Sequence, residues 1–173
     1  EYSIEIYRNA VVEWGDTDEG NFLAVDPSAL VLGGTRYAVV GTSDVPGYSF
    51  DMNSDPGWSL QGGWAYGQPG GAGGDPSSGY TGANVVGYNL GGQYPDNLSV
   101  QYATTGPLDF TGITGTTLSF RRWLGVESAS WDHANIQVSN DGVTWFNVWN
   151  HVGGTIAESN WSLQTYDISA VAD

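Results

Sequence analysis

The fold of this chain is decided by the stretch Trp131-Asp132-His133-Ala134-Asn135-Ile136-Gln137-Val138-Ser139-Asn140-Asp141-Gly142-Val143-Thr144-Trp145-Phe146-Asn147-Val148-Trp149. Apolar and polar residues alternate over 134–139, which is typical of a half-buried β-strand. Asp141-Gly142 tolerates the positive backbone angles of a two-residue hairpin turn. Residues 144–149 are β-branched and aromatic and predict the return strand. We therefore expect a β-hairpin with a tryptophan, an acid and a histidine gathered at its mouth.

Further strands are predicted on both sides of this hairpin. Alternating or β-branched residues predict them at 2–8, 10–14, 30–32, 36–42, 98–103, 116–124 and 161–168. No window has a sustained helical period, and glycine and proline punctuate short strands, which favours an all-β antiparallel sandwich.

Composition changes near residue 45. Residues 48–93 are dominated by Gly, Asp, Asn, Pro, Trp and Tyr. We expect a main domain at 45–173, preceded at 1–44 by strands that either belong to the tail of a neighbouring domain or join the main sheets.

Charge and composition exclude several classes of partner. The chain has 4 basic residues, all arginine, against 19 acidic residues, for a net charge of −15. Nucleic acid is a poor partner, because phosphate binding requires clustered Lys and Arg. The chain has no cysteine for a disulfide, and no apolar run is long enough for membrane insertion. Its many glycines, tryptophans and tyrosines are typical of an extracellular or cell-surface β-module.

Two acidic segments are candidate calcium sites. Asp51, Asn53 and Asp55 alternate along one loop, and calcium prefers six to eight oxygen ligands at short range. The alternative is an ordinary turn stabilised by Asp and Asn side chains. Asp16 and Asp18 form a second candidate, for which a plain acidic turn is again the alternative.

No motif predicts catalysis. The sequence contains no H-E-x-x-H, no G-x-S-x-G and no phosphate-binding glycine loop. Two carboxylates suffice for a glycosidase, but nothing marks such a pair. Asp132-His133 is either a metal-ligating or catalytic pair or a structural hydrogen-bonding group. We expect a protein that is not an enzyme.

Aromatic residues are the candidates for ligand binding. An exposed aromatic face stacks on a sugar ring, whereas a buried one only fills the core. The candidate residues are Trp58, Trp64, Tyr66, Tyr80, Tyr88 and Trp131. For Trp58 and Trp64, core packing is the favoured alternative.

Residues from about 45 to the end resemble the MAM-like, cleaved-adhesin-type jelly-roll modules of secreted bacterial multidomain proteins. The matching pieces, in order, are the Phe-acid segment 49–58, the Trp-x-x-Gly-x-Pro segment 63–69, the Gly-rich stretch 82–94, the strand 117–124, the acid-His pair Asp132-His133, the strand 135–139 and the turn 140–142. The resemblance implies a two-sheet antiparallel jelly roll, no catalysis and a structural Ca²⁺ site that uses Asp51 and Asp132.

These expectations combine into two functions. The first is a non-catalytic, calcium-stabilised extracellular β-sandwich module for adhesion or carbohydrate binding, whose partner is a glycan or a cell-surface protein. Modules of this type usually continue beyond the equivalent of residues 166–168 into a further strand, and the N-terminal strands could replace it. The alternative is therefore a structural subunit of a surface layer or fibre, assembled by strand exchange through the N-terminal strands.

Overall fold

A computed structural model describes residues 2–6, 12–16, 21–25 and 47–172. The chain divides into two compact units, Glu1–Pro46 and Gly47–Asp173. All described strand pairs are antiparallel. The predicted β-rich class is thus confirmed.

The N-terminal unit contains a three-stranded antiparallel sheet in the order β1-β2-β3. Its strands are β1 (Tyr2–Ile6), β2 (Val12–Asp16) and β3 (Asn21–Val25). Asp16 pairs with Asn21 across the predicted acidic turn, and β3 was not predicted. Asp18 and the strands predicted at 30–32 and 36–42 lie outside the described residues.

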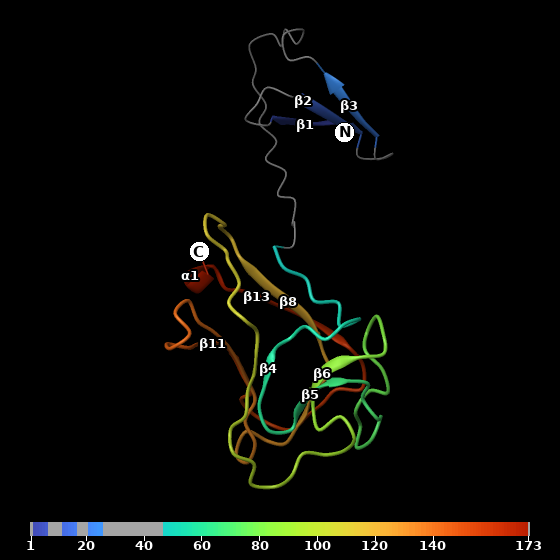
Figure 1. The fold of residues 1–173 in the computed structure, drawn as a ribbon, viewed down its shortest axis with the longest axis vertical. Helices are drawn as coiled ribbons and strands as arrows, with labels where there is room; N and C mark the ends of the chain where they lie inside the picture. The colour runs from blue at the N-terminus through green and yellow to red at the C-terminus, as the bar shows by residue number, and fades with distance from the viewer. Residues whose placement is uncertain (1, 7–11, 17–20, 26–46, 173) are drawn as a thin grey trace. The chain divides into compact units, whose positions relative to one another are not determined.

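The second unit is built from five two-stranded antiparallel sheets (Figure 1). The pairs are β4 (Ser59–Leu60) with β7 (Ala103–Thr104), β5 (Trp64–Gly67) with β6 (Val85–Tyr88), β8 (Thr117–Arg122) with β13 (Ser162–Asp167), β9 (Gly125–Val126) with β12 (Ile156–Ala157), and β10 (Asn135–Val138) with β11 (Phe146–Asn150). These pairings do not by themselves form two larger sheets, so the jelly-roll topology stays a prediction.

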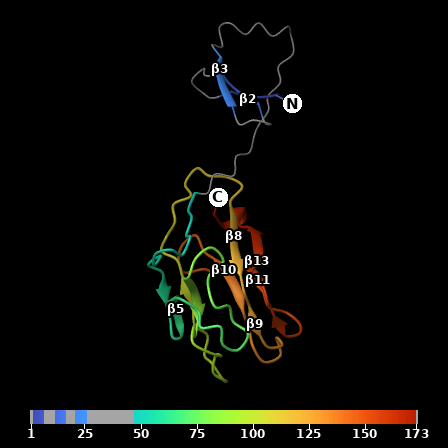
Figure 2. The same ribbon diagram turned by 90° about the vertical axis from the view of Figure 1, so that its right-hand side faces the viewer.

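Strands β8 and β13 form one of the longest pairs and lie side by side in both views (Figure 2). Exposed and half-buried residues alternate along both strands, as a sheet with one covered face requires. On the covered face Phe120 lies near Tyr166, with ring centroids 6.1 Å apart. The strands predicted at 116–124 and 161–168 are confirmed.

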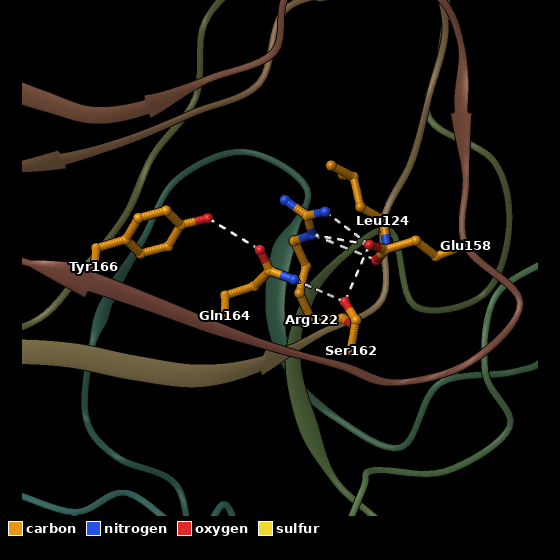
Figure 3. Close-up of polar contacts among 6 residues, drawn as sticks. All are labelled: Arg122, Leu124, Glu158, Ser162, Gln164 and Tyr166. Atoms are coloured by element: carbon orange, nitrogen blue, oxygen red, sulfur yellow. Dashed lines mark hydrogen bonds and ion pairs between the residues drawn. The ribbon is translucent and has the colours of Figure 1, made fainter.

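An ion pair on the covered face links β8 to its neighbours (Figure 3). Arg122 Nη2 lies 2.7 Å from Glu158 Oε1, and the guanidinium carbon lies 4.9 Å from the ring centroid of Trp149 in β11. Glu158 also accepts hydrogen bonds from the Leu124 N–H at 2.7 Å and from Ser162 Oγ at 3.1 Å. Arg122 therefore connects the β8–β13 pair to the β10–β11 pair.

The predicted hairpin is confirmed, but the prediction of a two-residue turn is wrong. β10 and β11 pair as expected, and the last pair is Val138 with Phe146, so a loop over 139–145 replaces the two-residue turn. Asp141 shapes this loop, since its Oδ1 accepts hydrogen bonds from the N–H groups of Val143 at 2.8 Å and Thr144 at 2.7 Å. Of the two residues Asp141 and Gly142, only Gly142 has the predicted positive φ, which is 71°.

Two other elements differ from expectation. Residues 98–102 are not a strand, and β7 begins only at Ala103. Leu98 and Val100 are 40% and 73% exposed, so the alternation of apolar residues there has no surface to pack against.

A single helical turn, α1 (Ser169–Ala172), follows β13 where no helix was expected. Asp167 Oδ1 accepts the Ser169 N–H at 3.0 Å and so begins this turn.

The interior of the described second unit consists mainly of half-buried side chains. Val126 is its buried aliphatic residue, and Thr116 and His151 are its buried polar residues. Several large apolar side chains are exposed, among them Trp131 at 79% and Val143 at 81%. The sheets therefore leave much apolar surface open to solvent or to a ligand.

Candidate ligand-binding site at the hairpin mouth

The open end of the β10–β11 hairpin borders a hollow of about 470 Å³. The hollow is lined by Ala129, His133, Ala134, Asn135, Asn150, His151, Val152 and Gly153. Asn135 pairs with Asn150 at the end of the ladder, and the His151 N–H extends it by donating to the Ala134 carbonyl at 2.8 Å. Pairing thus places two side-chain amides and an exposed histidine, His133, around one concavity.

Trp131 is presented by a turn immediately before this hairpin. The Trp131 N–H donates to the Ser128 carbonyl at 2.8 Å, and the Ala129 N–H donates to the Gly153 carbonyl at 2.9 Å. These bonds fix the turn on both sides while the indole stays 79% exposed. Only Asp132 separates Trp131 from His133, which lines the hollow, so an apolar ring and hydrogen-bonding groups occur together at the mouth.

His151 lines the hollow and contacts two backbone carbonyl groups. Its side chain is 5% exposed, and its ring nitrogens lie 3.3 Å from the Asp132 carbonyl oxygen and 2.8 Å from the Gly154 carbonyl oxygen. A neutral imidazole has one N–H, so it donates to one of these carbonyls at a time. His151 was not among the predicted site residues, because only pairing with Ala134 brings it to the hairpin mouth.

Asp132 is held by a tyrosine rather than by its neighbour His133. The Tyr94 hydroxyl donates to Asp132 Oδ2 at 2.5 Å and accepts the Glu127 N–H at 3.3 Å. Burial, followed by the hydrogen bond to the Asp132 carboxylate, raises the pKa of Tyr94. This bond ties the Gly-rich loop to the hairpin mouth.

Four of the predicted ligand-binding aromatics are half-buried and make structural contacts. Trp64 packs edge-on against Tyr88 at 5.8 Å between centroids, and Trp58 packs in the same way against Phe50 at 5.4 Å. Tyr66 donates to the Met52 carbonyl at 2.9 Å. These contacts suit the core-packing alternative, whereas Tyr80 and Trp131 are 53% and 79% exposed.

The predicted calcium ligands bond to their own loops. Both oxygens of Asp51 accept hydrogen bonds from Asn53, at 2.9 and 2.7 Å, and these bonds lower the pKa of Asp51. Asp55 Oδ1 accepts the Gly57 N–H at 2.9 Å. Among the residues that the structure describes, no three acidic or histidine side chains gather as metal ligands.

Asp16 lies at the end of β2. Calcium binding stays a prediction, which melting curves recorded with calcium and with EDTA would test.

Comparison of the chain with protein-family models, with curated proteins and with solved structures gave no match. Within the part of the chain that the structure describes, no helix is both long enough and apolar enough to span a membrane.

Proposed function

We propose that this chain is a non-catalytic extracellular module that binds carbohydrate at the mouth of the β10–β11 hairpin. The observation that carries the proposal is the 79% exposure of Trp131 beside a hollow whose lining includes two asparagine amides and His133. Exposing an indole to water is unfavourable, so an exposed indole on a turn held by backbone bonds is well suited to cover an apolar partner.

The chemistry of the mouth matches a sugar. The apolar C–H face of a sugar ring packs on an aromatic face, and its hydroxyl groups both donate and accept hydrogen bonds. Asn135 and Asn150 each offer a carbonyl acceptor and an NH₂ donor, and His133 adds a ring nitrogen. Binding sites that combine an apolar surface with a few placed polar groups fix both affinity and orientation.

The jelly-roll resemblance is part of this proposal. The Arg122 guanidinium contacts the Trp149 ring and so connects two strand pairs, which supports a packing of sheets in layers. The low number of basic residues and the absence of cysteine agree with a surface-exposed bacterial module. Strand exchange through the N-terminal strands stays a prediction, and size-exclusion chromatography of the full chain would test it.

The test is a glycan array followed by calorimetry with the sugar that binds. Trp131→Ala should weaken binding at least tenfold, about 1.4 kcal/mol, because the stacking surface is lost. Trp131→Phe should retain part of the affinity.

Val143→Ala is the matched control, since Val143 is 81% exposed at the far end of the hairpin. If the Trp131→Ala variant bound as tightly as the parent chain, the hairpin mouth would not be the binding site.

A further inference from the structure

The exposed side of the β8–β13 pair is a surface separate from the hairpin mouth. Alternate residues of a strand point to the same side of a sheet. The exposed residues on this side are Thr117, Ser119, Arg121, Leu163, Thr165 and Asp167. Arg121 pairs with Leu163, and Ser119 pairs with Thr165. We refer to these six residues as the β8–β13 face.

The guanidinium of Arg121 is held in place by an aromatic ring. Its central carbon lies 4.2 Å from the ring centroid of Tyr80, which is within the range of a cation–π contact. The loop that carries Tyr80 is closed by a hydrogen bond from the Gly79 N–H to the Ala83 carbonyl at 3.2 Å. A Cβ at Gly79 would lie 2.5 Å from the Asn84 carbonyl oxygen, so the loop is packed closely at this point.

Arg121 differs from Arg122 in what it binds. Arg122 is paired with Glu158 on the covered face, whereas Arg121 makes no ion pair with any residue that the structure describes. Because Tyr80 supports one face of the guanidinium, its N–H groups remain available at the surface. A planar guanidinium donates two parallel hydrogen bonds to a carboxylate, and this bidentate geometry selects that group.

We propose that the β8–β13 face binds a saccharide that carries a carboxylate, and that Arg121 binds the carboxylate. Leu163, which is 56% exposed, lies opposite Arg121 and offers an apolar contact for the C–H face of the sugar ring. The hydroxyls of Ser119 and Thr165 lie 3.5 Å apart at the next pair on the same side. An acidic sugar presents a carboxylate, an apolar face and hydroxyl groups on one rigid ring, which matches this set of neighbours.

The negative charge of the chain does not prevent this binding. Charges separated by more than a Debye length, about 8 Å at physiological ionic strength, are largely screened. The acidic residue on the same face, Asp167, pairs with Thr117, four residues from Arg121 along β8. Four residues of a strand span about 14 Å. The cation at Arg121 therefore dominates the potential at its own position.

Calorimetry on the full chain tests the proposal with two probes, a trisaccharide of galacturonic acid and the galactose trisaccharide of the same linkage. These probes differ only in the carboxylate groups. The acidic probe should bind at least tenfold more tightly than the neutral one at physiological ionic strength, where the other charges of the chain are screened, and Arg121→Ala should remove that preference. Arg121→Lys should retain part of it, because an ammonium keeps the charge without the bidentate geometry.

Asn140→Asp is the control for net charge, since it makes the same change of one unit at an exposed position of the hairpin loop. It should leave the preference unchanged. Equal binding of the two probes, no binding of either, or a preference that survives Arg121→Ala would overturn the proposal. Failure at the hairpin mouth would show as an unchanged affinity in Trp131→Ala, whereas failure at this face would show as an unchanged acidic preference in Arg121→Ala, so the two failures give different results.

Discussion

Asp141 shows how a single carboxylate replaces an expected turn type. Asp-Gly predicted a two-residue turn, yet only Gly142 has a positive φ. The Asp141 carboxylate instead accepts the N–H groups of Val143 and Thr144 and the Ser139 hydroxyl, the last at 2.9 Å. Local side-chain bonds of this kind compete with a regular turn, so the longer loop follows from the chemistry of Asp rather than from Gly.

We predict that the Asp141 carboxyl titrates well below the ordinary pKa of aspartate. Hydrogen bonds from the backbone N–H groups of Thr144 and Val143, and then from the Ser139 hydroxyl, favour its ionised form. A lowered folded pKa means that the stabilisation is present at neutral pH and is lost as the pH falls through that value. Carbon-detected NMR titration measures the midpoint, and titration near the ordinary value of about 3.9 would contradict the bond pattern.

Arg121 was not predicted as a binding residue. Tyr80 was selected as a stacking residue, but the Arg121 guanidinium lies over its ring. The two residues are distant in sequence, and no periodic pattern connects a loop tyrosine to a strand arginine. A signal was nevertheless present, because the adjacent pair Arg121-Arg122 holds two of the chain's 4 basic residues and strand alternation places them on opposite faces.

At the scale of the element, β8 and β13 are stabilised by a network of hydrogen bonds on their covered face. Glu158 accepts bonds from Arg122, Leu124 and Ser162, and the chain of bonds continues from Ser162 through Gln164 to Tyr166 (Figure 3). Partly buried charges are tolerated only when they are paired in this way. The network therefore determines how closely β8, β13 and the segment before β13 pack together.

We predict that Glu158→Gln destabilises the protein at pH 7 and much less at acid pH. Burial raises the pKa of Glu158, but hydrogen bonds from Arg122, Leu124 and Ser162 outweigh it, so the pKa is lowered in sum. The stabilisation is thus full above the unfolded pKa of about 4.3 and is lost as the pH falls through the folded value.

Urea midpoints of the parent chain and of this variant at pH 7, 5 and 3 measure the effect, with Glu127→Gln at an exposed position as the control. At pH 7 the loss should be about 1.5–3 kcal/mol, the range for hydrogen bonds to a charged group. A difference that stays constant down to pH 3 would show that the Glu158 charge is not the cause.

At the scale of the whole molecule, period-two alternation succeeded where one face of a strand pair is covered. It predicted β8, β13 and the central hairpin, whose strands pair with each other or with strands that follow in the sequence. It failed at 98–102, because the pattern cannot say whether another element covers Leu98 and Val100. The same limit applies to the site: Trp131 could be selected by type, whereas Asn150 and His151 reach the mouth only through strand pairing.

Net charge also acts on the molecule as a whole, and we predict that salt stabilises it. A net charge of −15 opposes the compact state through self-repulsion, and added salt screens that repulsion. The melting temperature should therefore rise as NaCl is increased from about 10 mM, where the Debye length is about 30 Å, to about 150 mM. A variant with the exposed residues Asp96 and Glu127 changed to Asn and Gln should show a smaller rise. A fall with salt would mean that ion pairs such as Arg122–Glu158 contribute more to stability than the repulsion removes.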